Sequence, residues 1–202
     1  LVIRDGKTVE ISDSDMFAAE NIHLIDIPGV GKLEAFPNGD ALKYADLLGI
    51  ERSNLQNIGR YAMRWPGHCA FWKKMIDLHL LDSEPIFVDG VAVDRKKFLA
   101  EALAPHLQYT DDERDVTVVR VEANGQLNGE EKRLIYQMVD KRNLETDFMS
   151  MNRTVGLTVS IGALMIGSGQ LTKRGLLSPI NDIPFEPFVK ELAARNIQVT
   201  SS

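Results

Sequence analysis

The sequence has few of the features that mark secreted, metal-binding or membrane proteins. Its 202 residues contain one cysteine, Cys69, so no disulfide can form within the chain. The four histidines include no pair at the H-x-x-x-H spacing that would place two zinc ligands on one helix face. No apolar run approaches the roughly 20 residues that span a bilayer, and no signal peptide pattern is present. These absences predict a soluble, cytoplasmic protein with neither a structural metal nor a membrane segment.

The sequence also lacks the glycine patterns that bind phosphate groups. A G-x-G-x-x-G run at a strand-to-helix turn lets backbone amides approach a pyrophosphate. The G-V-G run at 29–31 is followed by Glu34 at the position of the third glycine, and the G-S-G run at 167–169 is followed by Thr172. No G-x-x-x-x-G-K-[ST] loop and no G-x-S-x-G nucleophile elbow occurs. The chain by itself therefore has no complete catalytic apparatus.

Positive charge is scarce as well. The 29 acidic residues outnumber the 23 lysines and arginines, which gives a net charge of -6 and a pI near 5.3. A nucleic-acid partner is excluded on this ground, because nucleic-acid binders gather Lys and Arg on one face and the basic residues here are scattered. The composition, 44% hydrophobic and 26% charged, is typical of a globular protein, and we expect a single domain over residues 1–202. The start at Leu1 predicts a fragment of a longer gene product, or a chain trimmed of a tag.

Turn residues separate short β-prone runs near the start of the chain. Residues 1–4 and 8–11 flank the Asp5-Gly6 dipeptide, which suits the positive φ angles of a tight hairpin. Residues 22–27 and 32–36 flank a Pro-Gly turn in the same way. Further along, alternation predicts an antiparallel pair from residues 116–123 and 134–139.

Helical periodicity follows or separates these strands. This periodicity predicts helices at residues 41–48, after Pro66-Gly67, after the N-cap Asp94, at residues 154–166, and in the last segment around Phe188. Residues 154–166 are apolar almost all round, which predicts a helix buried between two layers. The fold class is therefore α+β, with a mixed, largely antiparallel sheet covered by helices on one face.

The segment at 60–69, R-Y-A-M-R-W-P-G-H-C, carries the densest chemistry. Arg60 and Arg64 interrupt an extended apolar run just before a Pro-Gly turn. Alternation places both arginines on one face, where their guanidinium groups could each bind a carboxylate bidentately. A solvent-facing pair of edge arginines is the alternative, and the pattern alone favours it. Adjacent His68 and Cys69 suggest an acid and a nucleophile, but neighbouring side chains at a helix start usually diverge.

Two further segments could offer backbone amides to an anion. In the F-P-N-G-D segment at 36–40, Asn38 and Gly39 suit a turn and Asp40 can cap the next helix. In the S-M-N-R-T segment at 150–154, the amides of a helix start and Arg153 form a candidate anion site. A simple turn with a helix cap is the commoner outcome at both places.

Four segments together resemble one known family. They lie at 36–40, 60–69, 150–156 and 174–179, the last reading R-G-L-L-S-P. In this order and with these separations they resemble the C-terminal region of the saccharopine dehydrogenase family, which includes lysine 6-dehydrogenase-like members. The family versions read F-P-N-R-D, R-G-T-L-R-Y-P-G, M-A-R-T-T-G and R-G-V-L-x-P, and the resemblance extends over about residues 22–199.

The resemblance implies a two-part, NAD(P)-dependent enzyme. A nucleotide-binding Rossmann domain, which this chain lacks, would bind NAD or NADP and carry the catalytic acid-base groups. The present chain would supply the pocket for a small amino-acid substrate and the contact of a homodimer, and would be inactive alone. A module that binds an amino acid, or only dimerises, without being an enzyme is the alternative.

The resemblance also assigns roles to individual residues. Arg64 matches the family's substrate-binding arginine, and Met63 takes the place of the leucine before it. Arg60 or Arg153 would assist Arg64 in holding the substrate carboxylate, and Asn38 would hydrogen-bond the same group. Gly39 stands where saccharopine-forming members have an arginine that contacts the substrate. This difference favours a substrate with fewer carboxylates than saccharopine, such as lysine or a carboxylated polyamine.

Overall fold

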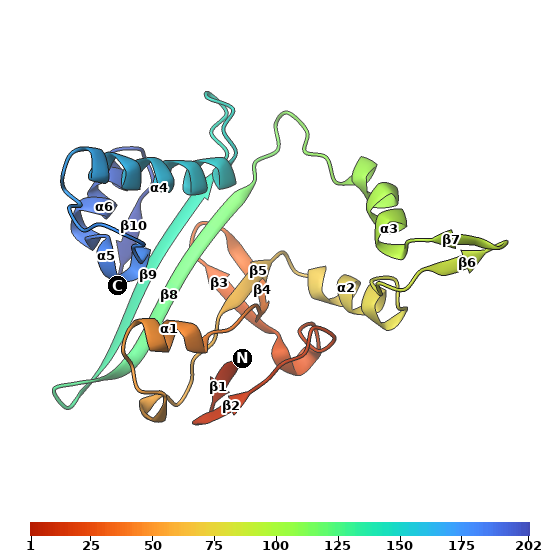
Figure 1. Cartoon of the computed structure of the whole chain (residues 1–202), viewed down its shortest axis with the longest axis horizontal. Helices are drawn as coiled ribbons and strands as arrows, with labels where there is room; N and C mark the ends of the chain where they lie inside the picture. The colour runs from red at the N-terminus through yellow and green to blue at the C-terminus, as the bar shows by residue number, and fades with distance from the viewer. The chain divides into compact units, whose positions relative to one another are not determined.

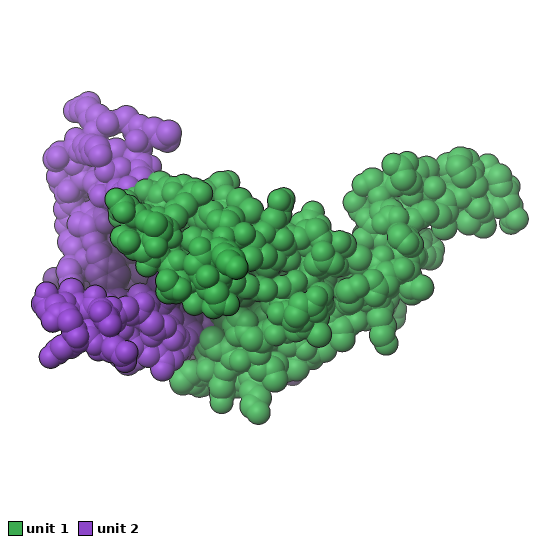
Figure 2. Space-filling model, turned by 90° about the horizontal axis from the view of Figure 1, so that it is seen from below, with its two compact units in different colours: residues 1–108 green, residues 109–202 purple.

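The computed structural model describes all 202 residues, which divide into two compact units, Leu1–Gln108 and Tyr109–Ser202 (Figures 1 and 2). The fold is α+β, as the sequence predicts. Every strand pairing is antiparallel, and the strands divide among four small sheets. No helix combines the length and the apolar content that crossing a bilayer requires. The single-domain organisation stays a prediction, and the two units are described one at a time.

The first unit opens with the expected hairpin. Strands β1 (Val2–Arg4) and β2 (Lys7–Val9) pair around Asp5 and Gly6, whose φ angles are 49° and 72°. The backbone of Ile3 also exchanges hydrogen bonds with Ile58, at 3.0 and 3.1 Å. Because Ile3 is buried, this bridge anchors the chain start against the segment that leads into the candidate arginines.

A three-stranded sheet forms the centre of this unit. Its order is β3 (His23–Ile27), β4 (Gly31–Pro37) and β5 (Tyr61–Arg64). Ile27 of β3 is buried, and so are Leu33, Ala35 and Phe36 of β4. The central strand β4 is thus buried on both faces, and β5 at the edge carries Met63 opposite Ala35 and Arg64 opposite Glu34.

Helices follow β4 and β5 directly. Helix α1 (Leu42–Leu47) buries Leu42 and Ala45, and the Asp40 side chain accepts a hydrogen bond from the Leu42 amide at 3.0 Å, as predicted for a cap. Helix α2 (His68–Asp77) begins just after β5 and buries Cys69. Two short 3-10 turns, η1 (Ala19–Asn21) and η2 (Arg52–Asn54), complete the connections.

The rest of the first unit has little core. Strands β6 (Ile86–Val88) and β7 (Val91–Val93) form a hairpin, followed by α3 (Arg95–Leu103) and the 3-10 turn η3 (Ala104–His106). Asp94 caps α3 as predicted, by accepting from the Lys97 amide. None of these elements buries a residue. The apolar residues of α3 therefore find little to pack against, and Phe98 is 62% exposed.

The second unit is built on one long hairpin. Strands β8 (Val116–Leu127) and β9 (Glu130–Lys141) pair over their whole length, and β10 (Val199–Ser201) pairs with the other edge of β9. Helices α4 (Ser150–Gly167), α5 (Pro179–Asp182) and α6 (Phe185–Ala193) gather beside the β9–β10 end of this sheet (Figure 1). The expected antiparallel pair is confirmed, and it is longer than the alternation predicts.

The core of the second unit joins α4 to the sheet and to α6. Its buried members are Met138, Ile161, Met165, Leu171, Leu192 and Ile197. Only one stripe of α4 takes part, because Val155, Val159 and Ile166 lie on the surface, with Val159 69% exposed. The prediction that this helix is buried between two layers is therefore wrong. The helix is apolar on most sides, but the second unit packs against only one of its faces.

This stripe predicts a large difference between two residues of the same helix. Ile161→Ala removes a side chain with no exposed surface and should lower the free energy of unfolding by about 2–5 kcal/mol, through lost burial and a cavity. Val159→Ala is the matched control and should change it by less than about 0.5 kcal/mol. Urea unfolding followed by far-UV circular dichroism measures both. Equal effects would contradict the assignment of the buried face.

Candidate functional site

The structure brings five of the six candidate residues together in the first unit. Asn38 and Gly39 lie where β4 ends, Arg60 directly precedes β5, and Met63 and Arg64 lie within it. The Asn38 amide donates to the Arg60 carbonyl at 2.9 Å, which continues the β4–β5 pairing to the end of both strands. The turn and the arginine-bearing strand therefore form one local structure.

The backbone conformation of Gly39 favours glycine, and the side chain of Arg60 lies against it. Its φ of +82° is strained for any residue with a side chain. A Cβ atom at Gly39 would also lie 2.8 Å from Nη1 of Arg60. The guanidinium of Arg60 therefore packs on the bare glycine, and a side chain at position 39 would displace it.

Arg60 and Arg64 are cations without an acidic partner. Arg64 donates from Nη1 to the neighbouring Met63 carbonyl at 2.8 Å, and no carboxylate lies within 4 Å of either guanidinium. Both residues are exposed, so their charge costs little in water. They are chemically able to bind a carboxylate, while Met63 is half-buried on the opposite face of β5.

The carboxylate facing Arg64 serves another purpose. Glu34 accepts hydrogen bonds from the Gly67 amide at 2.8 Å and the Cys69 amide at 2.9 Å, and thereby caps α2 from strand β4. Burial raises the pKa of Glu34, but these hydrogen bonds outweigh it, so the pKa lies below its usual range. The sequence shows Glu34 between the buried residues Leu33 and Ala35, but it does not show which helix start this carboxylate faces.

Cys69 has no properties of a nucleophile. Its side chain is 1% exposed, and burial, followed by the hydrogen bond and charge of Glu34, raises the pKa of its thiol to about 12. His68 stacks on Phe36 at 5.9 Å, and burial and then Arg64 lower its pKa. At neutral pH the thiol is therefore protonated and inaccessible, which argues against an acid and nucleophile pair here.

Arg153 belongs to the second unit and is held by that unit's own groups. Its Nε lies 3.0 Å from Oδ2 of Asp140, and its Nη2 donates to the Arg195 carbonyl at 3.2 Å. Both members of this ion pair are almost fully buried. The guanidinium thus fixes the start of α4 to β9 and to the end of α6.

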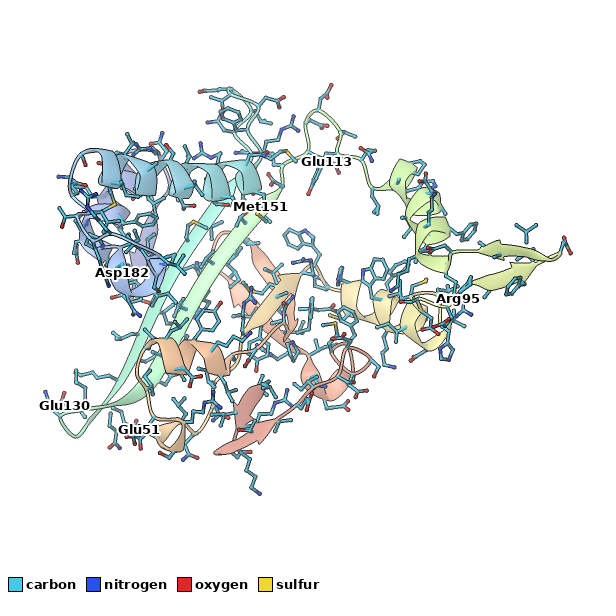
Figure 3. The ribbon with its side chains drawn as sticks, in the orientation of Figure 1. Glu51, Arg95, Glu113, Glu130, Met151 and Asp182 are labelled. Carbon is cyan, nitrogen blue, oxygen red and sulfur yellow. The ribbon has the colours of Figure 1, made fainter.

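The expected anion site at the start of α4 is filled by the chain itself. Asp115, just before β8, accepts from the Ser150 amide at 2.7 Å, the Ser150 hydroxyl at 2.8 Å and the Met151 amide at 3.1 Å. Met151, labelled in Figure 3, marks this first turn. The prediction of an external anion at these amides is wrong, because an internal carboxylate already satisfies them.

No dinucleotide site fits the residues of this chain. The glycines at 29–31 form the hairpin turn between β3 and β4, and those at 167–169 lie at the C-terminal end of α4. Neither is the strand-to-helix turn whose amides hold a pyrophosphate. In addition, no three His, Cys, Asp or Glu side chains gather into a set that could hold a metal ion.

Comparison with known proteins identifies the family. The sequence profile of the saccharopine dehydrogenase C-terminal domain matches residues 1–197. The chain belongs to this family. Mitochondrial alpha-aminoadipic semialdehyde synthase of Mus musculus is 21% identical over 96% of the chain and 27% of its own length. The apo structure of saccharopine dehydrogenase (L-Glu forming) from Saccharomyces cerevisiae superposes with a TM-score of 0.82 and 21% identity, over 100% of this chain and 57% of the yeast chain.

The comparisons establish the family and the fold of the chain. The resemblance carried by the four sequence segments is confirmed, and this saccharopine dehydrogenase-type fold is shared with the yeast enzyme. The yeast relative is named as a dehydrogenase, so the chain is part of an oxidoreductase family. The chain spans only about a quarter of the mouse relative's length.

The cap on α4 predicts an acid-sensitive unit. Burial raises the pKa of Asp115, but the Ser150 and Met151 hydrogen bonds outweigh it and lower the pKa. A carboxyl with a lowered folded-state pKa contributes stability above its unfolded pKa, and loses it as the pH falls through the folded value. Asp115→Ala should cost about 2 kcal/mol at neutral pH, and progressively less as the pH falls below about 4, the ordinary carboxyl value. Exposed Glu131→Gln is the control, and urea unfolding across pH measures the difference; a pH-independent cost would contradict the cap.

The burial of Cys69 predicts a slow thiol. At pH 8 the folded protein should react with an aromatic disulfide reagent at least about a hundredfold more slowly than the urea-unfolded chain, because few thiolates form and access is blocked. Glu34→Gln removes the neighbouring charge and weakens the α2 cap, so its folded state should react faster than the wild type. Equal rates for the folded and unfolded wild type would show that Cys69 is exposed.

Proposed function

We propose that this chain is the substrate-binding and dimerising part of an NAD(P)-dependent oxidoreductase that acts on the CH–NH group of an amino acid. The nucleotide would bind to a domain outside this chain, since no turn here fits a dinucleotide. Family membership supports the class of reaction. The observation that carries the assignment to this unit is the pair of unpaired guanidinium groups, Arg60 and Arg64, beside β5.

Arg64 would hold the substrate carboxylate. Its guanidinium can donate two parallel hydrogen bonds to a carboxylate, and no internal acid competes for it. Arg60 would add a second donor, and Asn38, tied to Arg60 through the backbone, would hydrogen-bond the same group. The protein's contribution is then orientation of the amino-acid substrate for hydride transfer at the carbon that bears its nitrogen.

The substrate would carry fewer carboxylates than saccharopine. The positive φ of Gly39 disfavours an arginine at that position, and a side chain there would have to displace the guanidinium of Arg60. A charge-assisted contact is worth roughly 1.5–3 kcal/mol, or about tenfold to a hundredfold in binding. Lysine or a carboxylated polyamine fits a site with one such contact fewer.

A non-enzymatic module that binds an amino acid, or only dimerises, is the second candidate. It is favoured by the absence of any phosphate-binding turn or reactive nucleophile in the chain. The gene product that contains this chain separates the two. Reduction of NAD⁺ or NADP⁺ that depends on an added amino acid supports the enzyme, and its absence with lysine, saccharopine and carboxylated polyamines supports the module.

Within the complete enzyme, Arg64→Ala should raise the KM for the amino acid at least about tenfold, because one charged donor to the carboxylate is lost. Arg52→Gln is the matched control, since Arg52 is an exposed arginine of the same unit that pairs with Asp46 at 2.7 Å. Initial rates at 340 nm and a thermal melt of each variant measure the effects. An unchanged KM in Arg64→Ala would remove Arg64 from the binding site.

A further inference from the structure

The sheet of the second unit has an unpaired edge along β8. Strands β8 and β9 form one long hairpin (Figure 1), and the strand order β10-β9-β8 makes β8 the outermost strand. β8 runs over 12 residues, from Val116 to Leu127, and its only pairing is with β9. No backbone group of another segment bonds to it. One full-length side of this strand therefore keeps its hydrogen-bonding groups free.

Alternation decides which residues of β8 face this edge. On β9, the Ile135 backbone bonds to the chain end that follows β10, at 2.8 and 3.0 Å. In an antiparallel ladder the next residue, Tyr136, then bonds to the strand on the other side, where it lies opposite Val121 of β8. The N–H and C=O groups of Val121 thus point to β9, and those of Arg120 and Glu122 point to the open edge.

β8 lacks most features that keep an exposed strand edge from pairing. Soluble proteins make such strands short, interrupt them with proline or bulges, or place lysines on them, because an open edge pairs with other chains. β8 is long, contains neither proline nor lysine, and pairs with β9 without a break in register. Its two charged residues, Arg120 and Glu122, have opposite signs. This edge is therefore suited to pairing with a further strand.

An apolar strip lies along the same edge. Met138 of β9 packs in the core with α4 and α6, on the helix-bearing face of the sheet. Val119, opposite Met138, and Val121 share this face but are 52% and 59% exposed. Leu134 of β9, on the same face, is 54% exposed. The helices thus cover the β9–β10 side of this face and leave the β8 side bare.

The order of charges along β8 fits a second copy of the same strand. If β8 pairs antiparallel with itself about a two-fold axis at Val121, Arg120 of each copy lies opposite Glu122 of the other. Moving the axis by one residue in either direction would place two glutamates or two arginines opposite one another, which is unfavourable. The backbone groups of Arg120 and Glu122 both face the edge, so the register about Val121 also forms backbone hydrogen bonds.

We propose that two copies of this chain join along β8, in antiparallel register about Val121, and unite their three-stranded sheets into one. Val119 of each copy lies opposite Ala123 of the other, and the two apolar strips meet at the axis. The contact uses both β8 edges, so it closes as a dimer and leaves only the short β10 at each end of the sheet. The inference rests on the dimer of the proposed function and not on its oxidoreductase chemistry.

Cysteine cross-linking tests this register in the 202-residue chain. Val121 occupies a non-hydrogen-bonded position on the axis, where paired Cα atoms lie about 4.5 Å apart, within the range that a disulfide bridges. Val119→Cys is the matched control, because its face and exposure are similar but its two copies lie four residues, or about 14 Å, apart. Under mild oxidation, Val121→Cys should form a disulfide-linked dimer at least about tenfold faster than Val119→Cys. Native Cys69 does not compete, since it is buried and its thiol has a pKa of about 12.

A charge reversal tests the pairing without a covalent bond. Glu122→Arg places Arg120 opposite an arginine in both symmetric pairs, so it should weaken dimerisation at least about tenfold in sedimentation equilibrium. Arg133→Glu is the matched control. It breaks the ion pair with Glu122 within the chain, but it lies on β9 and leaves the edge unchanged. Equal dissociation constants for the two variants would overturn the proposal.

The outcomes separate this inference from the proposed function. A dimer in which Val121→Cys and Val119→Cys cross-link at equal rates would overturn the β8 register and leave the proposed dimer standing. A monomeric wild-type chain would overturn both the register and the dimer. The amino-acid-dependent reduction of NAD⁺ or NADP⁺ by the complete gene product tests the chemistry independently of either result.

Discussion

The structure depends on a carboxylate from the strand side of each unit that caps the helix packed on its sheet. Glu34 of β4 caps α2 and Asp115 before β8 caps α4, across 33 to 36 residues of sequence. A helix start leaves amides unsatisfied, and burying them without acceptors is costly. The two acids satisfy them and fix each helix in position on its sheet. Because these amides are taken, neither helix start can bind an external anion.

The arginines of the chain also differ in whether a carboxylate of the chain already pairs with them. Arg153 is buried and pairs with Asp140, and Arg142 is buried and pairs with Asp147, so both charges stabilise the second unit. Arg60 and Arg64 have no such partner. If the protein binds an anion as proposed, the unpaired guanidinium groups of β5 and its start are available for it, whereas the two helix starts capped by Glu34 and Asp115 are not.

Local chemistry was readable from the sequence, and long-range chemistry was not. Asp5-Gly6, Asp40 and Asp94 act on backbone within a few residues, so the hairpin and both caps could be predicted. The Asp89-Gly90 dipeptide carried the same turn signal between two equally short strands, and that hairpin was missed. The caps by Glu34 and Asp115 could not be predicted, since a strand residue does not reveal which helix start it faces. The exposed face of α4 was not predicted for a related reason. Apolar composition predicts burial, but only the folded unit shows how many layers pack against the helix.

The glycine at position 39 shows how such a long-range contact changes a functional argument. In the sequence, this glycine stands where saccharopine-forming members of the family have an arginine. In the structure, the space beside it is occupied by the guanidinium of Arg60, 2.8 Å from where a Cβ would lie. The glycine therefore means one charge fewer at this position, and the guanidinium of Arg60 occupies the space beside it. If Arg64 holds the substrate carboxylate as proposed, the cationic surface beside it is smaller but more tightly defined. Under that proposal, such a surface would discriminate among substrates by their number of carboxylates, because an extra carboxylate would be desolvated without a partner.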